Sequence, residues 1–385
     1  MILLIGILTL GVWLYLVIAR GGFWRNGESD AGQPPAPRRW PRVVAVVPAR
    51  DEAEGIGATV RSLLRQSSAG TFTLVLVDDN STDGTAAVAR AAAQETGQAS
   101  ALIIVSGSAL PAGWTGKMWA VNQGVAAALE MARPVDYLLL TDADITHAPD
   151  TLAWLVAQAE SRKLVLTSFM AKLRCETLAE RAHVPAFIYF FQMLYPFPWV
   201  NRPKNATAAA AGGCMLVRAD ALEAAGGIAA IRGALIDDCA LARVMKRQGP
   251  IWLGVTDRVR SVRPYPRLDD FRRMVARSAY AQLNYSPLLL AGTTLGMALT
   301  YLAPPLLAIF AHGAAQWCGL AAWMLMALSF QPMLRFYKLS LLWGLALPVT
   351  AFLYMLYTLD SGFQYMSGRG GQWKGRVQAN VSSRG

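Results

Sequence analysis

Short apolar runs alternate with amphipathic stretches in the first half of the chain. The runs that have the composition and length of buried strands lie at 43–47, 73–77, 101–105, 137–140 and 163–169. Apolar residues recur at helical spacing between them, over 52–66, after Gly84, over 117–130 and over 150–160. Pro48 is expected to end the first run. Alternating strands and helices predict an α/β fold with a mostly parallel sheet and helices on both faces.

The N-terminus is uniformly apolar. Residues 2–19 carry no charge and are close to the length of about 20 residues that a spanning helix needs. No Lys or Arg precedes this run, whereas Arg20 and Arg25 follow it, which favours an uncleaved anchor over a signal peptide. We therefore expect residues 1–19 to be a transmembrane anchor, with residue 20 onward on the cytoplasmic side.

The C-terminal part is also strongly apolar. Three stretches of near-spanning length lie at 288–311, 315–334 and 339–359. They predict a transmembrane region over 287–360 with two or three helices, the first of them kinked at Pro304-Pro305. Whether the number of membrane crossings is odd or even stays open, and so does the side on which the C-terminus lies. Three spans would place the basic tail 361–385 outside, although its Arg369, Lys374, Arg376 and Arg384 favour the inside.

The remaining segments follow from composition. Residues 20–42 are rich in Pro, Gly and charge and are expected to be a linker. Residues 43–270 have the pattern of a globular domain, and 271–286 that of an amphipathic interfacial segment. Residues 183–200 are apolar and aromatic with three prolines, so they fit an interfacial segment or a buried loop of the domain.

Charge and cysteine content narrow the partners. The chain of 385 residues has a net charge of +11, yet the basic residues form no dense stripe interleaved with aromatics. Nucleic acid is therefore not expected as a partner. An anionic lipid surface is expected to face the arginines at 258, 260, 263, 267, 272, 273 and 277. Cys175, Cys214, Cys239 and Cys318 show no CxxC spacing, which argues against zinc or a redox pair.

Acidic residues follow three of the expected strands. Asp51-Glu52, Asp78-Asp79 and the pair Asp142 and Asp144 all come directly after an apolar run. Because ligands of parallel sheets bind beyond the carboxyl ends of the strands, we expect these clusters to converge at one edge.

The pair Asp142 and Asp144 indicates a metal. If the strand continues, alternate residues share a face and both carboxylates point the same way. Two hard oxygen ligands suit Mg²⁺ or Mn²⁺, which also take phosphate oxygens. This makes a nucleotide-linked substrate plausible. His147 follows closely and is either a third ligand or a loop histidine.

Glycine turns add two further candidates. Lys117 follows Gly113-Trp114-Thr115-Gly116, a turn that lets backbone and a lysine charge approach a phosphate, or that is merely structural. Gly212-Gly213 permits close backbone approach on the acceptor side, or forms a simple turn.

These motifs carry a resemblance. The order PARDE (48–52), VDDNSTDGT (77–85), DAD (142–144) and IDD (236–238) resembles family-2 glycosyltransferases of the GT-A fold over about residues 43–255. With GWTGKMWA, GGCMLVR and the apolar ends, the chain resembles the bacterial hopene-associated glycosyltransferases. The resemblance implies a Rossmann-like GT-A catalytic domain over 43–270. It also implies a multi-pass protein of the bacterial inner membrane, whose catalytic domain faces the cytoplasm.

The resemblance also implies roles for single residues. Asp79 would accept the uracil N–H of a UDP-sugar, with Asp78 supporting its turn. The nucleotide pocket would be lined by Pro48, Ala49 and Glu52, with Lys117 near the phosphates. Of Asp142 and Asp144, one would hold Mg²⁺ or Mn²⁺ on the diphosphate, and the other would hold the metal or the sugar. The general base would be Asp238, with Asp237 in place of the usual glutamate.

The implied chemistry is consistent with the residue types. A divalent cation neutralises the leaving diphosphate, so no strong acid is needed. A base must take the proton of the acceptor hydroxyl, and a carboxylate can do so if burial or its neighbour Asp237 raises its pKa. Direct attack with one base inverts the anomeric centre, by analogy with inverting glycosidases. The expected activity is therefore inverting transfer from a nucleotide sugar to a lipid acceptor, with a hopanoid implied by the resemblance.

Processive relatives carry a QxxRW motif after the base, and the segment 271–283 lacks it. This favours transfer of a single sugar over polymer synthesis. Arg273 and Arg277 lie one helical turn apart and could meet a diphosphate, although contact with membrane headgroups is the favoured expectation. The alternatives are a polyprenyl-phosphate glycosyltransferase, a polysaccharide synthase and, less favoured, a non-catalytic membrane scaffold. A UDP-sugar is favoured over a GDP-sugar, and the sugar itself is not predicted.

Overall fold

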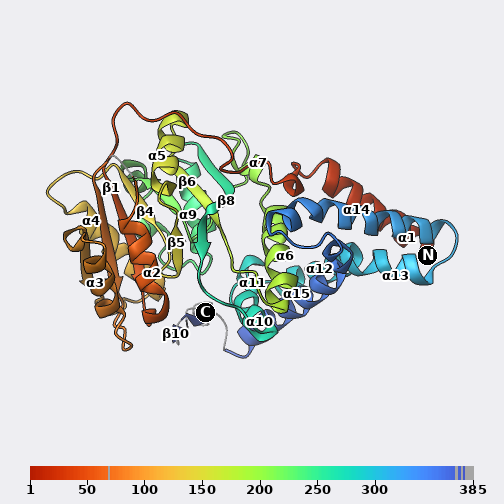
Figure 1. Cartoon of the computed structure of the whole chain (residues 1–385). Helices are drawn as coiled ribbons and strands as arrows, with labels where there is room; N and C mark the ends of the chain where they lie inside the picture. Colours follow the sequence, from red (N-terminus) through yellow and green to blue (C-terminus); the bar gives the residue numbers. More distant parts are fainter. Residues whose placement is uncertain (68–69, 369–371, 374–375, 378–385) are drawn as a thin grey trace.

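The computed structural model describes residues 1–67, 70–368, 372–373 and 376–377. The chain forms an α/β part built on one sheet and an elongated helical part beside it (Figure 1). The N-terminus lies at the end of the helical part that is farthest from the sheet (Figure 1).

The sheet has eight strands in the order β3-β2-β1-β4-β7-β6-β8-β5. The strands are β1 (Val43–Ala49), β2 (Phe72–Asp78), β3 (Leu102–Ser106), β4 (Tyr137–Leu140), β5 (Ile145–His147), β6 (Leu166–Lys172), β7 (Met215–Arg218) and β8 (Ile251–Ser261). The neighbours from β3 to β4 are parallel, as are β6 and β8. β7 runs antiparallel to both of its neighbours, and β5 runs antiparallel to β8. The α/β prediction with a mostly parallel sheet is confirmed.

Helices cover both faces of this sheet. Both faces need a cover, because successive apolar side chains of β1 point to opposite faces. Val44 and Val46 belong to a core with α4 (Gly116–Leu129), α8 (Ala219–Ala224) and α9 (Asp237–Lys246). Ala45 and Val47 point the other way, into a core with α2 (Ala53–Leu64), α3 (Thr85–Glu95) and α5 (Thr151–Arg162). Short 3₁₀ turns lie at η1 (Phe23–Arg25), η2 (Ala99–Ala101) and η3 (Ile228–Ile231).

Two strand boundaries differ from the expectation. Pro48 does not end β1, which continues to Ala49. The carbonyl of Val46 accepts from Thr141 on the β4 side, so Pro48, two residues on, faces the same side just beyond the end of β4. Its missing N–H therefore breaks no ladder bond. β6 begins at Leu166 rather than 163, because Lys163 ends α5 in a left-handed conformation with φ of 53°.

The helical part brings together both ends of the chain. It contains α1 (Ile2–Ile18), α6 (Leu178–Leu194), α7 (Phe197–Val200), α10 (Leu268–Ala276), α11 (Ala279–Gln282), α12 (Pro287–Met297), α13 (Ala303–Phe310), α14 (Ala314–Phe336) and α15 (Trp343–Met366). In the described residues, two helical stretches are long and apolar enough to cross a membrane, 287–310 and 314–336. They are consistent with membrane association. The 17 residues of α1 are a shorter apolar helix, so the anchor stays a prediction.

Pro304-Pro305 alters the helix that contains it, and α1 forms hydrogen bonds to that helix at the altered turn. A π-helical turn, η4 (Ala298–Leu302), separates α12 from α13. Pro304 has no N–H to donate to the carbonyl of Thr300, which accepts instead from Nε1 of the fully buried Trp13 at 2.7 Å. The hydroxyl of Thr9 donates to the carbonyl of Leu299 at 2.8 Å. The expected kink is thus a site where α1 binds the C-terminal helices.

Residues 183–200 are helical, so the expectation of a buried loop is wrong, whereas the interfacial placement stays a prediction. Most of this stretch is α6, which continues through Pro185 and buries Val184, Ile188 and Tyr189. The ring of His183 in α6 stacks on Phe271 of α10 at 4.7 Å. A capping box of Thr177 and Glu180 starts this helix, which fixes its direction at the boundary between sheet and helical part.

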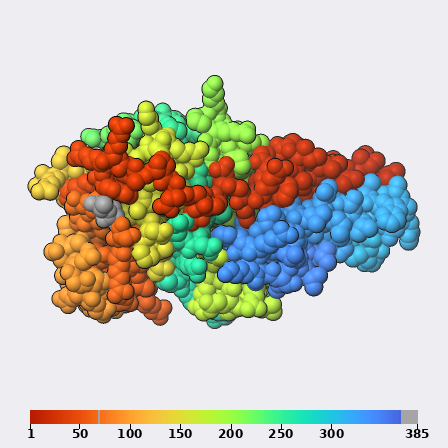
Figure 2. All heavy atoms as spheres, turned by 45° about the horizontal axis from the view of Figure 1, so that its top comes forward, coloured from red at the N-terminus to blue at the C-terminus, as the bar shows by residue number. Residues whose placement is uncertain are grey.

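The 20–42 segment is docked rather than free. It runs across the α/β part as the red chain of Figure 2. Asp30 pairs with Arg258 at 2.7 Å, and Nε1 of Trp154 donates to the carbonyl of Gly32 at 2.7 Å.

Most of the arginines assigned to a lipid surface are paired inside the protein instead. Their acidic partners are Asp30 and Asp150 for Arg258, Asp257 for Arg260, Glu52 and Asp144 for Arg263, Asp270 for Arg267, Asp269 and Asp360 for Arg272, and Asp269 and Asp270 for Arg273. The partners of Arg258 and Arg263 could not be read from the sequence because they lie far away along the chain, whereas Arg260, Arg267 and Arg273 pair with acids three or four residues away. The four cysteines are free thiols, with Cys214 and Cys239 buried. Of the expected basic tail, Arg369, Lys374 and Arg384 lie outside the described residues.

Candidate functional site

The three acidic clusters converge as predicted. Ala49 of β1 pairs in register with Asp78 of β2, and Val46 pairs with Leu140 of β4. The residues that follow these strands therefore meet at one edge of the sheet, where parallel α/β folds bind ligands.

The β1–β2 side forms a rigid polar turn. Asp79 is 1 % exposed, and its backbone N–H donates to the carbonyl of Ala49 at 2.8 Å. Arg50 lies beside it, with Nη1 2.6 Å from the Asp79 carbonyl oxygen and 3.6 Å from the carboxylate. Asp78 accepts from the backbone N–H of Ser81 at 3.0 Å, which closes the turn. The nucleotide roles of Asp78 and Asp79 stay predictions.

An open cleft of about 220 Å³ lies next to this turn. Six of the predicted site residues line it: Pro48, Glu52, Lys117, Asp142, Asp144 and Asp237. Four further polar lining residues were not predicted as site residues: Thr115, Arg263, Tyr265 and Arg277. Ala49 ends β1 at the same edge, fully buried.

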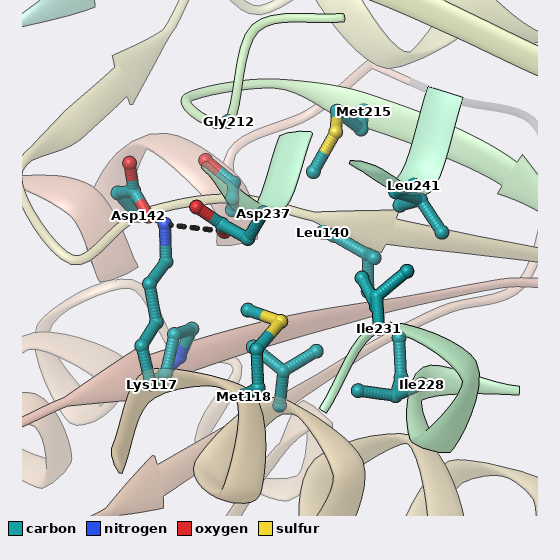
Figure 3. A pocket seen from close by; sticks show the side chains of 13 residues that line it. Lys117, Met118, Leu140, Asp142, Gly212, Met215, Ile228, Ile231, Asp237 and Leu241 are labelled. Atoms are coloured by element: carbon teal, nitrogen blue, oxygen red, sulfur yellow. Dashed lines mark ion pairs between the residues drawn. The ribbon is translucent and has the colours of Figure 1, made fainter. Parts of the chain in front are cut away.

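Lys117 links the two sides of the cleft (Figure 3). It lies in the first turn of α4, which Thr115 caps by accepting from the backbone N–H of Met118. Its Nζ is 2.9 Å from Oδ1 of Asp142 and 3.0 Å from Oδ2 of Asp237. Burial alone would lower the pKa of Lys117, but the two carboxylates outweigh it and raise that pKa. Lys117 is therefore a permanent cation in this site.

A small apolar cavity backs this ion pair. It measures about 20 Å³ and is walled by Met118, Val121, Leu140, Met215, Ile228, Ile231 and Leu241 (Figure 3). These side chains keep water away from one side of the Lys117 ammonium group, which strengthens its attraction to both carboxylates.

Asp142 and Asp144 share the cleft for a different reason from the one expected. β4 ends at Leu140, so the pair lies in a turn between β4 and β5 rather than at alternate positions of a strand. Burial raises the pKa of Asp142 against the opposing effect of Lys117. Asp144 instead pairs with Arg263, whose Nε lies 2.7 Å from its Oδ2.

Arg263 is the main residue that sequence reasoning missed. It follows β8 and also contacts Oε1 of Glu52 through Nη2 at 2.8 Å. Burial would lower the pKa of Arg263, but Asp144 and Glu52 raise it. No local motif identifies this residue, since 119 positions separate it from Asp144. The signal that the sequence offered for Arg263 was a series of isolated basic residues after the last strand.

Asp237 and Asp238 open α9. Asp237 lines the opposite wall of the cleft, whereas Asp238 lies next to it and does not line the cleft. Asp238 accepts from the backbone N–H groups of Gly212 at 3.1 Å and Cys239 at 2.7 Å. Burial, helped by the negative charge of Asp237, raises the pKa of Asp238 to about 6. A carboxylate with this pKa can accept a proton near neutral pH. The backbone of Gly212 thus approaches Asp238 closely, while the acceptor-side role expected for the glycine pair stays a prediction.

His147 is not at the site. It belongs to β5, not to a loop, and its Nε2 lies 3.1 Å from the hydroxyl of Thr141. Burial lowers the pKa of His147 to about 3, so it is neutral. It does not line the cleft.

The donor set fits a divalent cation that is shared with a substrate. Across the described residues, no three His, Cys, Asp or Glu side chains are close enough to form a complete protein cage for a metal. Mg²⁺ commonly uses one or two carboxylates and takes its other ligands from water and substrate phosphates. Asp142 and Asp144 on an open cleft match that pattern.

The structural comparison shows a shared fold along the chain. The chain is similar to the mannosyltransferase PcManGT from Pyrobaculum calidifontis, solved in complex with GDP-Man and Mn²⁺. Their identity is 18%, the likeness covers 96% of this chain and 100% of that chain, and the TM-score is 0.57. A second similar structure is glucosyl-3-phosphoglycerate synthase from Mycobacterium tuberculosis with Mg²⁺ and UDP, at 19% identity, 63% and 79% coverage and a TM-score of 0.41.

The sequence comparisons show a family similarity over part of the chain. No curated protein sequence matches the chain significantly. The family described as Glycosyl transferase family 2 matches residues 44–226, which contain β1 to β7 and the turn with Asp142 and Asp144. Residues 44–226 are thus similar to glycosyl transferase family 2, and the sheet that they build is GT-A-like.

Proposed function

We propose that this protein transfers a single sugar from a nucleotide sugar to a lipid acceptor, with inversion at the anomeric carbon. The observation that supports this best is that Asp142 and Asp237, one carboxylate from each pair, line one cleft. Asp142 lies 2.9 Å and Asp237 3.0 Å from the same Lys117 ammonium group. A donor held by one pair would therefore lie beside the base of the other.

The donor side would use the turn after β2 and the turn after β4. Asp79, buried and held by Arg50, would recognise the base of the nucleotide. Asp142 and Asp144 would hold Mg²⁺ or Mn²⁺, and the cation would neutralise the charge that develops on the leaving diphosphate. A UDP-sugar is the first candidate from the resemblance. A GDP-sugar is the second, since the similar mannosyltransferase was solved with GDP-Man.

The acceptor side would use Asp238. Its carboxylate would take the proton of the acceptor hydroxyl as that oxygen attacks the anomeric carbon. The bond from this carbon to the diphosphate oxygen breaks, and the nucleoside diphosphate leaves with the bonding electrons. Two backbone N–H donors fix the orientation of Asp238, and its raised pKa of about 6 makes it a stronger base than an exposed carboxylate.

A membrane-resident acceptor is proposed from the helical part. The stretches 287–310 and 314–336 support membrane association, and α1 binds the first of them through Trp13 and Thr9. We place the α/β part at the cytoplasmic face of a bacterial inner membrane, in keeping with Arg20 and Arg25 after α1. A hopanoid acceptor is the finest level of this proposal and rests on the family resemblance alone.

The test is sugar transfer by the full chain in detergent with added membrane lipid. A panel of UDP- and GDP-sugars with Mn²⁺ should yield one glycolipid product with a single added sugar. Asp238→Asn and Asp144→Asn should each lose activity by at least about a hundredfold, the lower range for a general acid–base group. Asp220→Asn is the matched control, since this exposed carboxylate pairs with Arg218 outside the cleft. Full activity in both cleft variants would falsify the mechanism.

The alternatives give different products. A polysaccharide synthase would form a ladder of oligomers, and a polyprenyl-phosphate glycosyltransferase would require a phosphorylated lipid. A non-catalytic scaffold would turn over no donor in the panel. The intact set of cleft carboxylates and their cations argues against the scaffold.

A further inference from the structure

We infer that Arg277 is a phosphate-binding residue of the cleft, an assignment that rests on the proposed function. The ligand is a phosphate group, supplied either by the diphosphate of the nucleotide or by a phosphorylated lipid acceptor. Arg277 caps the C-terminus of α10 and lines the same cleft as Asp142, Asp144 and Asp237.

The first argument is that the other cations of the cleft are already engaged. Lys117 bonds Asp142 and Asp237, and Arg263 bonds Asp144 and Glu52. Among the described residues, Arg277 forms no ion pair, and its side chain is exposed. It is therefore the lining cation whose guanidinium is free to meet an arriving anion.

The second argument is the contrast along α10 itself. Arg267 pairs with Asp270, Arg272 pairs with Asp269 and Asp360, and Arg273 pairs with Asp269 and Asp270. The helix thus neutralises its other arginines with its own acids or with α15, and leaves the one that faces the cleft without an acid.

The third argument is charge. Four carboxylates and three cations line the cleft, which leaves one net negative charge. A divalent cation on Asp142 and Asp144 would reverse the sign and attract a phosphate. The planar guanidinium of Arg277 can then donate two parallel hydrogen bonds to phosphate oxygens, which a lysine cannot do.

The fourth argument is that contacts with the C-terminal helices fix the backbone beside Arg277. The carbonyl of Ala276, the preceding residue, accepts from the Ser361 hydroxyl of α15 at 2.5 Å. The same hydroxyl accepts from the backbone N–H of Tyr280 at 3.0 Å. Arg272 adds its 2.7 Å ion pair to Asp360 of α15. The C-terminal helices therefore hold α10 in place against the cleft, so little backbone ordering is needed on binding.

The test compares Arg277→Ala with Arg273→Ala in the full chain in detergent. Arg273 is the matched control, because it is one helical turn away and paired outside the cleft. The first arm measures binding of UDP and of GDP with Mn²⁺ by calorimetry at low and high salt. Loss of a charge-assisted bond should weaken binding by about tenfold, less at high salt. Arg277→Lys should restore part of the affinity.

The second arm identifies the source of the phosphate. Binding of the protein to phosphatidylcholine vesicles is measured with and without 5% undecaprenyl phosphate. If a lipid phosphate is the ligand, Arg277→Ala should lose the increment that this lipid adds, whereas Arg273→Ala should keep it. If nucleotide binding falls instead, the donor diphosphate is the ligand.

The inference is overturned if Arg277→Ala matches the wild type within twofold in both arms, or if Arg273→Ala shows the same loss. Unchanged melting of the variants separates a binding loss from misfolding. The proposed function fails independently, if the wild type transfers sugar from none of the nucleotide sugars.

Discussion

At the level of single residues, the site is a set of carboxylates held by two bridging cations. The carboxylates could be predicted from the sequence, because Asp79, Asp142, Asp144 and Asp238 lie in short motifs directly after apolar runs or before a helix. Arg263 could not, because its importance comes from contacts to Asp144 and Glu52 that exist only after folding. The partners of Lys117 were hidden for the same reason.

The pH dependence of transfer should report Asp238. A general base works only when it is deprotonated, so kcat/KM should rise with pH through about 6, its raised pKa. Part of that rise in pKa comes from the charge of Asp237. Asp237→Asn should therefore move the acidic limb to lower pH, even if the rate itself falls. A pH–rate profile of both proteins measures this, and an unmoved limb would show that the limb belongs to another group.

Metal binding should compete with Lys117. The ammonium group occupies Oδ1 of Asp142, a predicted metal ligand. Lys117→Met keeps the length of the side chain and removes the charge, so Mn²⁺ alone should bind several-fold more tightly, as counted by electron paramagnetic resonance of free Mn²⁺. Lys204→Met in an exposed loop is the control. Weaker Mn²⁺ binding in Lys117→Met would mean that the lysine organises the site rather than competing for it.

At the level of elements, the alternating pattern predicted the correct type and order of β1 to β4, α2 to α5 and β6, but it missed the short strand β5. The features that this pattern did not predict have physical causes. Pro48 remains in β1 because its neighbour β4 has already ended, a fact of register that only the sheet shows. The segment 183–200 reads as a poor helix because Pro185 lies inside it. α6 nevertheless forms, since packing of Ile188 and Tyr189 outweighs the local penalty.

The stability of the contact between α1 and the C-terminal helices should depend on one hydrogen bond. Because Pro304 cannot supply an N–H, Trp13 is the donor that satisfies the Thr300 carbonyl. Trp13→Phe keeps an aromatic ring but leaves this carbonyl without that donor, which should cost about 1–2 kcal/mol in an apolar environment. Thermal unfolding in detergent measures the loss. Trp317→Phe, an exposed ring on α14, should change nothing, and equal melting of the two variants would contradict the assignment.

At the level of the whole molecule, the placement of the helices favours one answer to the number of membrane crossings, which the sequence left open. Three C-terminal spans would place the basic tail outside. In the structure, α14 ends beside the sheet, where the carbonyl of Phe336 accepts from Lys172 of β6 at 2.8 Å. α15 starts shortly afterwards at Trp343 and ends beside α10, where Ser361 bonds Ala276. Both ends of α15 therefore lie on the side of the α/β part, and the crossing helices are expected to be α1, 287–310 and 314–336.

This arrangement predicts a topology that labelling in cells can test. The turn between α13 and α14, which contains His312, joins the two long apolar stretches at the end of the molecule that is remote from the sheet (Figure 1). With the α/β part in the cytoplasm, His312→Cys should react with a membrane-impermeant maleimide from outside. Lys204→Cys should react only in inverted vesicles, and the wild type with its four free cysteines sets the background. A reporter fused after Ser367 should be cytoplasmic, because α15 returns to that side. An external reporter with a cytoplasmic Lys204→Cys would instead require α15 to cross the membrane, and the packing of Ser361 on α10 could then not persist in the bilayer.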